Sequence, residues 1–331
     1  MSSKLIVVLG ATGNQGGSVA DVYFNEPGYK VRAVTRNPSS AKAQALAARG
    51  AEVVQADLDS PATLLAAFKD ANIIFVASDF WSIYNRPDSK DKTKPGQFLN
   101  AWAGEQETQQ LKNAIDAAAK IPTLERFIFS SLPNVTKWSN GKYPHVYHFD
   151  SKARAEDYGR AMYPELWAKT SILQAGYFLS NYTTNTMSSL VKTPEGVVQL
   201  ITLAEKDRKF PLIAPEEDTG PLVKALVQNP PGKSVIAYRE MLTHREVADI
   251  FTKVTGLKTE IVTLPKGRLD AQLPDELKME FEDNFAYLNE FGYDYGDEPA
   301  VIRPRELDPA PVFETIEDYF RKHDWTKVIS S

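Results

Sequence analysis

The fold is decided by one stretch near the start of the chain, Lys4-Leu5-Ile6-Val7-Val8-Leu9-Gly10-Ala11-Thr12-Gly13-Asn14-Gln15-Gly16-Gly17. Residues 4–9 are apolar, as in a buried strand, and residues 18–24 have the spacing of a helix. A strand, a tight glycine turn and a helix N-terminus form a cradle in which backbone N–H groups and the helix dipole face an anion. The stretch therefore predicts a pyrophosphate site of the kind that binds dinucleotides in Rossmann folds.

The three glycines have the spacing Gly10-x-x-Gly13-x-x-Gly16, which differs from the common Gly-x-Gly-x-x-Gly fingerprint. Glycine lets the backbone turn sharply and approach a phosphate where a Cβ atom would collide. The alternative is an ordinary strand–helix turn without a ligand. The strand before the motif and the helix after it favour the binding site, because this is the context in which such glycines cradle phosphate.

The second strand, residues 29–35, indicates which dinucleotide binds. An NAD site places a carboxylate at the end of this strand, where it accepts hydrogen bonds from the ribose 2′-hydroxyl. No Asp or Glu occurs between Glu26 and Glu52, and the strand runs into Arg36. The guanidinium of Arg36 can bind a 2′-phosphate, with Lys42 adding a second positive charge. NADP(H) is therefore predicted over NAD(H); the alternative is that Arg36 is a solvated surface charge.

The composition excludes several classes of protein. The 331 residues are 43% hydrophobic and 24% charged, as in a globular chain long enough for two unequal lobes. A net charge of −5 without a basic block argues against direct binding of nucleic acid. The absence of cysteine excludes disulfides, thiolate catalysis and Cys-based metal sites. No metal is expected, because the four histidines lack a ligand pattern; they are His145, His148, His244 and His323.

The start of the chain and its apolar runs predict the compartment. The first strand begins at residue 4, which leaves no room for a signal or transit peptide. The longest apolar runs are far shorter than a membrane span, so no membrane contact is expected. We expect a cytoplasmic protein, with entry into the nucleus left open.

Strand and helix patterns alternate through the first half of the chain, as in a doubly wound parallel sheet. Four more strands are predicted, at residues 51–56, 72–77, 126–131 and 170–174. Long helices are expected near residues 97–120 and 150–162. By analogy with the fold, the strand order is expected to be 3-2-1-4-5-6. Asp57 follows the third strand, where it can contact an adenine amino group or simply shape a turn.

Residues 78–96 form a long polar segment that leaves the carboxyl end of the fourth strand. Ligands bind at that end in open α/β sheets, and long loops there are often functional. The segment carries Phe80, Trp81 and Tyr84. Their rings can stack on a nicotinamide or an apolar substrate, or they can anchor the segment to the core; both interpretations stay open.

The second half has shorter strands and more prolines, which predicts a smaller mixed α/β lobe. Residues 1–176 are expected to form the cofactor domain and residues 177–331 the second lobe, with part of 213–256 packing back on the first sheet. A capping box at Thr243–Glu246 opens a helix that Gly256 ends, so His244 receives no chemical role. Further helices are predicted at residues 274–291 and 312–323.

Short-chain dehydrogenases use a Tyr-x-x-x-Lys pair on one helix face, and no tyrosine of this chain has a lysine four residues later. Lys152 stands four residues after His148 instead. A histidine can donate a proton near neutral pH, or it can cap the helix or bond a nearby carbonyl. Lys152 is expected to hold the ribose or act in catalysis. Ser130 and Ser131 end the fifth strand, where a serine orients substrate or only bonds the local backbone.

The chain resembles the NmrA-like family of atypical short-chain dehydrogenase/reductases, relatives of isoflavone and lignan reductases. The likeness spans the cofactor lobe and part of the second lobe. It rests on Gly10-Ala-Thr-Gly13-Asn-Gln15-Gly16-Gly17, Val34-Thr-Arg36-Asn-Pro38, Gly50-Ala-Glu-Val-Val-Gln-Ala-Asp57, Phe129-Ser130-Ser131, His148-Phe-Asp-Ser-Lys152, Ala175-Gly176-Tyr-Phe178-Leu-Ser-Asn181 and Asp218-Thr-Gly220-Pro.

The sequence features above, together with the resemblance, give a set of expected site residues. Catalytic roles fall on Lys152, His148 and Ser131. The expected contacts of NADP(H) are Gly10, Thr12, Gly13, Asn14, Gln15, Gly16, Arg36, Lys42, Asp57, Ser78, Phe80, Lys152, Tyr177 and Phe178.

The resemblance also implies two functions. The chain is most similar to NADPH-sensing members, which look like regulators that act through protein partners and also carry His-x-x-x-Lys. Members similar to the fungal nitrogen regulator act on a GATA transcription factor. The isoflavone-reductase-like branch is enzymatic and uses the lysine without the tyrosine. A redox-sensing regulator is therefore expected first. The alternative is an oxidoreductase that reduces a small apolar substrate in a pocket of Phe80, Trp81, Tyr147, Tyr177 and Phe178.

Overall fold

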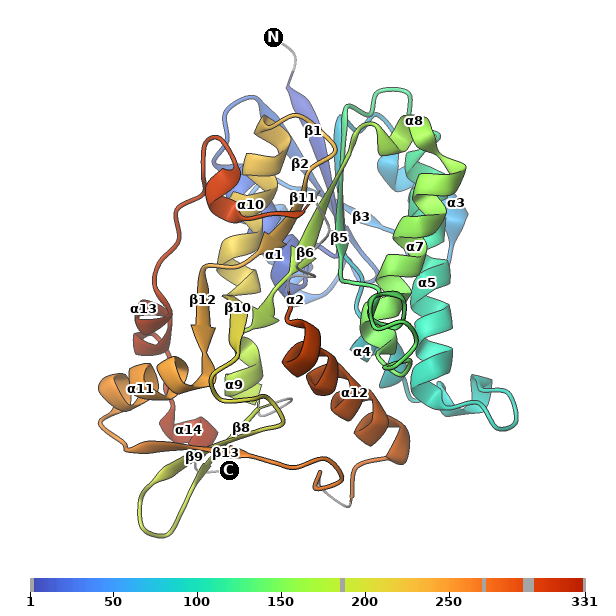
Figure 1. Cartoon of the computed structure of the whole chain (residues 1–331). Helices are drawn as coiled ribbons and strands as arrows, with labels where there is room; N and C mark the ends of the chain where they lie inside the picture. The colour runs from blue at the N-terminus through green and yellow to red at the C-terminus, as the bar shows by residue number, and fades with distance from the viewer. Residues whose placement is uncertain (1–2, 185–187, 270–271, 294–300, 330–331) are drawn as a thin grey trace.

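A computed structural model describes residues 3–184, 188–269, 272–293 and 301–329. Its centre is an eight-stranded sheet in the order β14-β11-β6-β5-β4-β1-β2-β3 (Figure 1). All seven pairings are parallel. The strands are β1 (Lys4–Leu9), β2 (Tyr29–Thr35), β3 (Glu52–Gln55), β4 (Ile73–Val76), β5 (Arg126–Ser131), β6 (Thr170–Ala175), β11 (Ser234–Ala237) and β14 (Val301–Ile302). The predicted Rossmann architecture and strand order are confirmed, with two strands from the second half added beyond β6.

Helices cover both faces of this sheet (Figure 1). Side chains alternate along a strand, so Ile6 and Val8 of β1 pack on one layer of helices while Val7 and Leu9 pack on the other. The first layer holds α1 (Asn14–Phe24), α2 (Ala41–Ala48) and α10 (Pro215–Gln228). The second holds α3 (Pro61–Phe68), α5 (Leu99–Ala118) and α7 (Tyr147–Met162). Because both faces are covered, the strands are apolar on both sides.

Helix α10 comes from the second half of the chain and packs tightly on α1. The Gly220 amide donates a 2.9 Å hydrogen bond to Ser18 Oγ. A Cβ atom on Gly220 would lie 2.2 Å from the Ser18 carbonyl oxygen, so only glycine allows this approach. Helix α10, which comes from the second half of the chain, therefore packs against the N-terminal part of α1 and fixes its position after the glycine turn.

The smaller lobe lies below the carboxyl ends of the main strands in the view of Figure 1. It holds two three-stranded sheets, β12-β10-β7 and β13-β9-β8. Their strands are β7 (Tyr177–Phe178), β8 (Ser189–Lys192), β9 (Val198–Thr202), β10 (Lys209–Ile213), β12 (Glu240–Thr243) and β13 (Thr259–Thr263). The helices of this half are α9 (Ser180–Thr184), α11 (His244–Thr255), α12 (Asp275–Phe291), α13 (Ile316–Arg321), α14 (Thr326–Ile329) and the 3-10 turn η2 (Pro304–Glu306).

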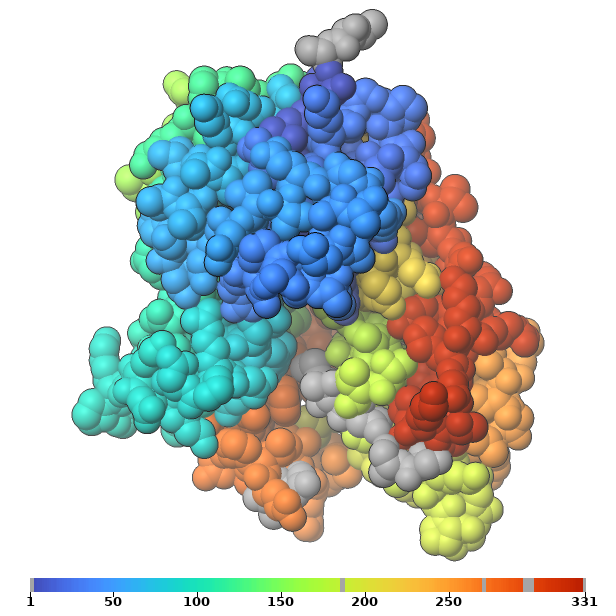
Figure 2. Space-filling view, turned by 180° about the vertical axis from the view of Figure 1, so that it is seen from behind, coloured from blue at the N-terminus to red at the C-terminus, as the bar shows by residue number. Residues whose placement is uncertain are grey.

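The segment 78–96 differs from the polar loop expected there. It contains α4 (Phe80–Tyr84) and the 3-10 turn η1 (Lys90–Lys92). Phe80 and Tyr84 are buried in a small core with Trp102 of α5, so the aromatic residues anchor the segment. The teal stretch that leads into α5 projects beside the orange C-terminal lobe (Figure 2). Two short helices, α6 (Val135–Trp138) and α8 (Pro164–Trp167), flank α7.

Two predicted helix starts are wrong. Helix α7 begins at Tyr147 rather than near residue 150, because its first turn is fixed by contacts with the second lobe that are described below. Helix α13 begins at Ile316 rather than near Val312, which is 90% exposed. The capping box of Thr243 and Glu246, with a left-handed Gly256 as C-cap, is confirmed.

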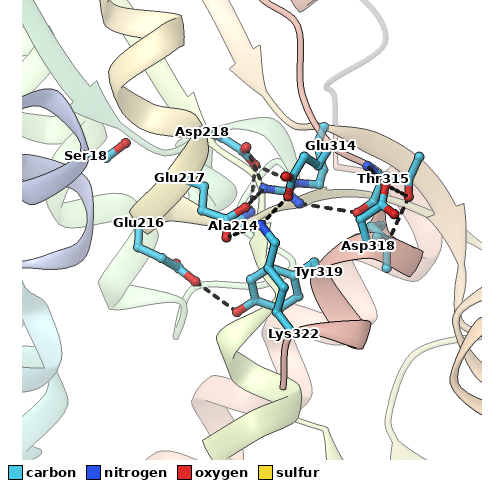
Figure 3. A network of polar contacts seen from close by, with 12 residues as sticks. Ser18, Ala214, Glu216, Glu217, Asp218, Glu314, Thr315, Asp318, Tyr319 and Lys322 are labelled. Atoms are coloured by element: carbon cyan, nitrogen blue, oxygen red, sulfur yellow. Dashed lines mark hydrogen bonds and ion pairs between the residues drawn. The ribbon is translucent and has the colours of Figure 1, made fainter. Parts of the chain in front are cut away.

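A buried ion-pair network fastens the C-terminal segment to the first turn of α10 (Figure 3). The guanidinium of Arg239 donates to both carboxylate oxygens of Asp218, at 2.9 and 2.7 Å. It also pairs with Glu217 at 2.7 Å, and Tyr319 of α13 donates to Glu216 at 2.9 Å.

Within the described residues, no helix combines the length and the apolar character that a membrane crossing requires.

His244 is buried at the start of α11, with the Phe210 ring centre 4.8 Å away. Neither ring nitrogen has a hydrogen-bond partner among the described residues. Burial lowers the pKa of His244 from its ordinary 6.5 to about 4. The folded protein therefore holds this ring neutral well into the acid range.

We predict that His244 makes the fold acid-sensitive. As pH falls from 6.5 toward 4, the unfolded chain binds a proton at this residue and the folded protein does not, so stability is lost. The two pKa values give a loss of about 2 kcal/mol at pH 5. His244→Phe should flatten the pH dependence of the urea-unfolding free energy between pH 7 and 5 by about that amount. Parallel curves for the two proteins would contradict the prediction.

Candidate active site

One cavity of about 540 Å³ opens at the carboxyl ends of the main strands and reaches into the second lobe. The glycine turn, β2, the segment after β4, β5, the start of α7 and α12 all contribute to its wall. Nearly every predicted site residue lines it: Gly10, Thr12, Gly13, Asn14, Gln15, Gly16, Arg36, Asp57, Ser78, Phe80, Ser131, His148, Lys152, Tyr177 and Phe178. Lys42 and Tyr147 do not; Lys42 is on the exposed face of α2, because the helix turns it away.

The glycine turn has the geometry of an anion cradle. Gly10 is left-handed (φ +74°), and a Cβ atom on Gly16 would lie 2.3 Å from the Gly10 carbonyl oxygen. Gly13 is the N-cap of α1, and as a glycine it has no side chain with which to cap this end of the helix. The first amides of α1 are thus left to face the cavity. Gln15 is held in place by Ser130, whose hydroxyl donates to Gln15 Oε1 at 2.8 Å.

Two arginines of the second strand region differ in their partners. Arg32 is bound by Glu52 at 2.9 Å and by the backbone carbonyl oxygens of Ala67 and Lys69 at 2.9 and 2.6 Å. The exposed guanidinium of Arg36 has no hydrogen bond or ion pair within the ranges that the structure describes, and it borders the cavity. Asp57, also in the wall, accepts a 3.0 Å hydrogen bond from the Asp59 amide, which shapes a turn. Arg36 is therefore a cation available to a ligand.

Lys152 is held by a buried carboxylate on α5. Its Nζ donates to the two oxygens of Glu107 at 2.7 and 2.8 Å, and to the His148 carbonyl oxygen at 3.1 Å. Glu107 is 0% exposed and also accepts from the hydroxyls of Ser151 and Ser78, the latter at 2.7 Å. All three ammonium N–H bonds are thus directed by the protein. The lysine is fixed at the cavity wall as a compensated charge.

His148 is held by a second buried carboxylate, Glu280 of α12. Glu280 Oε1 accepts from the backbone amide of His148 at 2.9 Å and lies 2.6 Å from its Nδ1. The other carboxylate oxygen accepts from Asn100 at 2.8 Å. The ring therefore bonds a residue 132 positions away, and its Nδ1 serves neither as a helix cap nor as a partner of a nearby carbonyl. With Nδ1 engaged, Nε2 is the nitrogen left for proton exchange.

A parallel contact fixes the chain just before α7. His145 Nδ1 lies 2.7 Å from Asp283, so two histidines three residues apart meet two carboxylates three residues apart on α12. The described residues hold no group of three or more His, Cys, Asp or Glu side chains that could bind a metal ion. The acid–histidine pairs instead join the second lobe to the first.

The half of the cavity beyond Lys152 is aromatic. The His148 ring lies among the rings of Phe80, Trp81 and Phe149, with centre-to-centre distances of 5.9, 5.2 and 4.8 Å. Tyr177, Leu288 and Tyr293 extend this wall from the second lobe. Ser131 lines the cavity too, and its hydroxyl donates to the Leu132 carbonyl oxygen at 3.3 Å.

Three residues of the site were missed in the sequence: Glu107, Glu280 and Asn284. A signal for them exists, because each is a polar residue on the apolar face of an amphipathic helix. Glu107 falls in step with the buried Ala103, Leu111 and Ala114 of α5. The helical period therefore predicts that these polar residues are buried, which is unusual, but it does not predict which residues they bind.

Residues 2–320 match the model of the NmrA-like family. The NmrA-like family domain-containing oxidoreductase hkm9 of Aspergillus hancockii is 31% identical over 278 residues, which are 80% of this chain and 76% of that protein. The crystal structure of NmrA, a negative transcriptional regulator, in complex with NADP has a TM-score of 0.76 at 21% identity, covering 99% of this chain and 97% of that one.

A second similar structure is the NADPH-dependent quinone oxidoreductase QOR2 of Escherichia coli complexed with NADPH. Its TM-score is 0.67 at 21% identity, and the match covers 96% of this chain and 98% of that one. At this level of identity the two structures show the shared fold.

We predict that Glu107 is needed chiefly to compensate Lys152. Glu107→Leu should lower the free energy of unfolding by about 3 kcal/mol, because it leaves a largely buried ammonium without its carboxylate. The double variant Glu107→Leu/Lys152→Met should recover at least half of that loss, since neither charge remains. Urea unfolding measures both. Additive losses in the double variant would contradict the coupling.

Proposed function

The chain belongs to the NmrA-like family, and on that basis we propose that it is an NADP(H)-dependent oxidoreductase that reduces a small apolar or aromatic substrate. The observation that carries the proposal is the continuity of the cavity. The glycine turn and the aromatic chamber are parts of one space, and Lys152 and His148 lie in its wall. The oxidoreductase name of the curated relative from Aspergillus hancockii supports the same activity.

The residues present fit the dinucleotide. The uncapped N-terminus of α1 and the Gly10–Gly16 contact, which excludes any Cβ, suit a pyrophosphate. Arg36, which follows β2 and has no ion pair with any described residue, suits a 2′-phosphate through its fork of N–H donors. The complexes of NmrA with NADP and of QOR2 with NADPH support this assignment. When bound, NADPH supplies a hydride.

In this proposal Lys152 stabilises negative charge and His148 donates a proton. Lys152 places a positive charge at the cavity wall, where it stabilises negative charge that develops on a substrate oxygen and can bind ribose hydroxyls. Glu280 orients the His148 ring through Nδ1, so that Nε2 can give a proton to the reduced substrate. The surrounding aromatic rings select an apolar body and limit the access of water.

Redox sensing through a protein partner is a second candidate. It is favoured by the complete engagement of Lys152, whose three donors are committed to Glu107 and the His148 carbonyl. In this case NADP(H) occupancy would change the segment 78–96 or the closure of the lobes, and with it the affinity for a partner. A difference of about 1–3 kcal/mol between the two states gives a 5–150-fold coupling. The partner and the cytoplasmic or nuclear location remain predictions.

We predict that Arg36 sets the cofactor preference. The wild-type protein should bind NADPH at least tenfold tighter than NADH, because a tenfold difference in affinity is about the contribution of one charge-assisted hydrogen bond. Arg36→Ala should remove the preference by weakening NADPH binding alone. Lys42→Ala is the matched control, because Lys42 lies outside the cavity and should leave the ratio within about twofold. Fluorescence titration measures the ratio for each of the three proteins, and equal wild-type affinities for the two cofactors would contradict the assignment.

We predict that NADPH oxidation depends on the two polar residues of the wall. A panel of ketones, quinones and enones should contain substrates, and Lys152→Ala or His148→Phe should lower their kcat by about 100-fold. Tyr147→Phe is the control next to His148, because Tyr147 is not part of the cavity wall.

Absence of NADPH oxidation with every compound of the panel would contradict the oxidoreductase proposal. A cytosolic pull-down run beside it tests the second candidate, which requires a partner whose retention differs between NADPH, NADP⁺ and no cofactor. Identical retention in all three conditions would exclude it.

A further inference from the structure

Helix α12 presents one face to the cavity. Glu280, Asn284 and Leu288 are spaced four residues apart, so they lie in one row along the helix. Glu280 binds His148, and the next two residues of the row line the cavity. The helix crosses below the carboxyl edge of the main sheet, where α4 lies and α5 begins (Figure 1). The row therefore runs from the proposed proton donor along the aromatic chamber.

Asn284 stands out in this row because its side chain has no hydrogen-bond partner among the described residues. Its side chain is 2% exposed, its Oδ1 is fully buried, and its carboxamide makes no hydrogen bond with any described residue. The hydroxyls of the neighbouring wall residues are satisfied: Tyr177 bonds Ser188 at 2.9 Å and Tyr293 donates to the Ala175 carbonyl oxygen at 2.8 Å. Among the described residues that line the cavity, Asn284 alone has a fully buried side-chain polar atom without a partner.

A buried acceptor without a donor destabilises the folded state. A leucine at this position would have a similar volume, a higher helix propensity and no desolvated amide. The chain carries the less stable residue in the wall of the cavity, where its Nδ2 amide group, which is not fully buried, also has no partner among the described residues. The missing hydrogen bond is therefore expected to come from the ligand.

This inference rests on the proposed reductase function. We propose that Asn284 determines specificity by donating a hydrogen bond from its Nδ2 amide group to a hydroxyl group on an aromatic or apolar substrate. The reducible group of that substrate lies toward Lys152 and His148, and its hydroxyl lies toward α12. A site built around a desolvated polar side chain rejects a substrate that lacks the matching group, because the side chain is then left unpaired. A methyl group in place of the hydroxyl keeps the shape and removes the bond.

The test uses matched pairs of 4-arylbut-3-en-2-ones that carry a hydroxyl or a methyl group at the 2-, 3- or 4-position of the ring. Dissociation constants are measured by calorimetry on the protein saturated with NADP⁺, and kcat/KM is measured with NADPH. The wild-type complex should bind the hydroxyl compound about tenfold tighter than its methyl partner at one ring position or more, the value of one net hydrogen bond.

Two variants separate recognition from packing. Asn284→Leu should abolish or reverse the hydroxyl preference while keeping the thermal unfolding temperature at or above that of the wild type. Leu288→Met, the neighbour in the same row, changes the shape of the wall without a polar group and should keep the preference.

The outcomes are distinct for the two proposals. A preference that Asn284→Leu removes, without NADPH oxidation, supports recognition by Asn284 and counts against reductase activity. Turnover with equal hydroxyl and methyl values in wild type and variant overturns the role of Asn284 and leaves the reductase standing; it would mean that water satisfies the carboxamide. Failure of every compound to bind the wild-type complex also overturns the inference.

Discussion

Helix α7 is held between two buried carboxylates, and the candidate site depends on this arrangement. Glu107 of α5 binds Lys152 from within the sheet domain, and Glu280 of α12 binds His148 from the second lobe. Both carboxylates are 0% exposed. A charge without solvent is strongly destabilising unless it is paired, so each acid fixes the position of its base. The two bases are therefore placed four residues apart on one helix by contacts that come from opposite sides.

Buried ion pairs of this kind do not give the most stable protein, because apolar residues of similar volume often do as well or better. Their contribution here is geometric. The carboxylate on His148 Nδ1 defines which ring nitrogen can exchange a proton, and Glu107 directs the ammonium of Lys152 along the cavity wall. The amide of Asn284, which has no partner among the described residues, belongs with them, since it also lowers stability at a position in the cavity wall. Such local conflicts between stability and residue choice are expected where a fold carries chemistry.

Local rules predicted the parts of this structure that depend on near neighbours. The glycine turn, the bounds of β2 and β5, and the capping box of α11 follow from residues within a few positions of each other. The pairs that build the site do not, because Lys152 and Glu107 are 45 residues apart and His148 and Glu280 are 132 apart. The sequence of residues 78–96 predicts a loop, because its buried aromatic residues are set among charged ones and no helical period stands out. Lys42 is predicted to contact the cofactor because it lies close to Arg36 in the sequence. In the structure its position on α2 places the side chain on the exposed face of the helix, outside the cavity wall.

The buried polar contacts also connect the nucleotide half of the cavity with the segment after β4. Ser78 begins that segment and donates to the same Glu107 oxygen that Lys152 contacts at 2.7 Å. A ligand hydroxyl that draws a donor of Lys152 away from Glu107 changes the electrostatic balance at this oxygen, and the Ser78 bond must respond. Phe80 and Trp81 follow two and three residues later, in contact with His148. A few short contacts thus lead from the nucleotide half of the cavity to the chamber wall. Catalysis would use this coupling to close the aromatic chamber around a substrate, and sensing would use it to alter the outer surface of the same segment. Both functions require the same physical link, and they differ only in which side of the segment 78–96 meets the second binding partner.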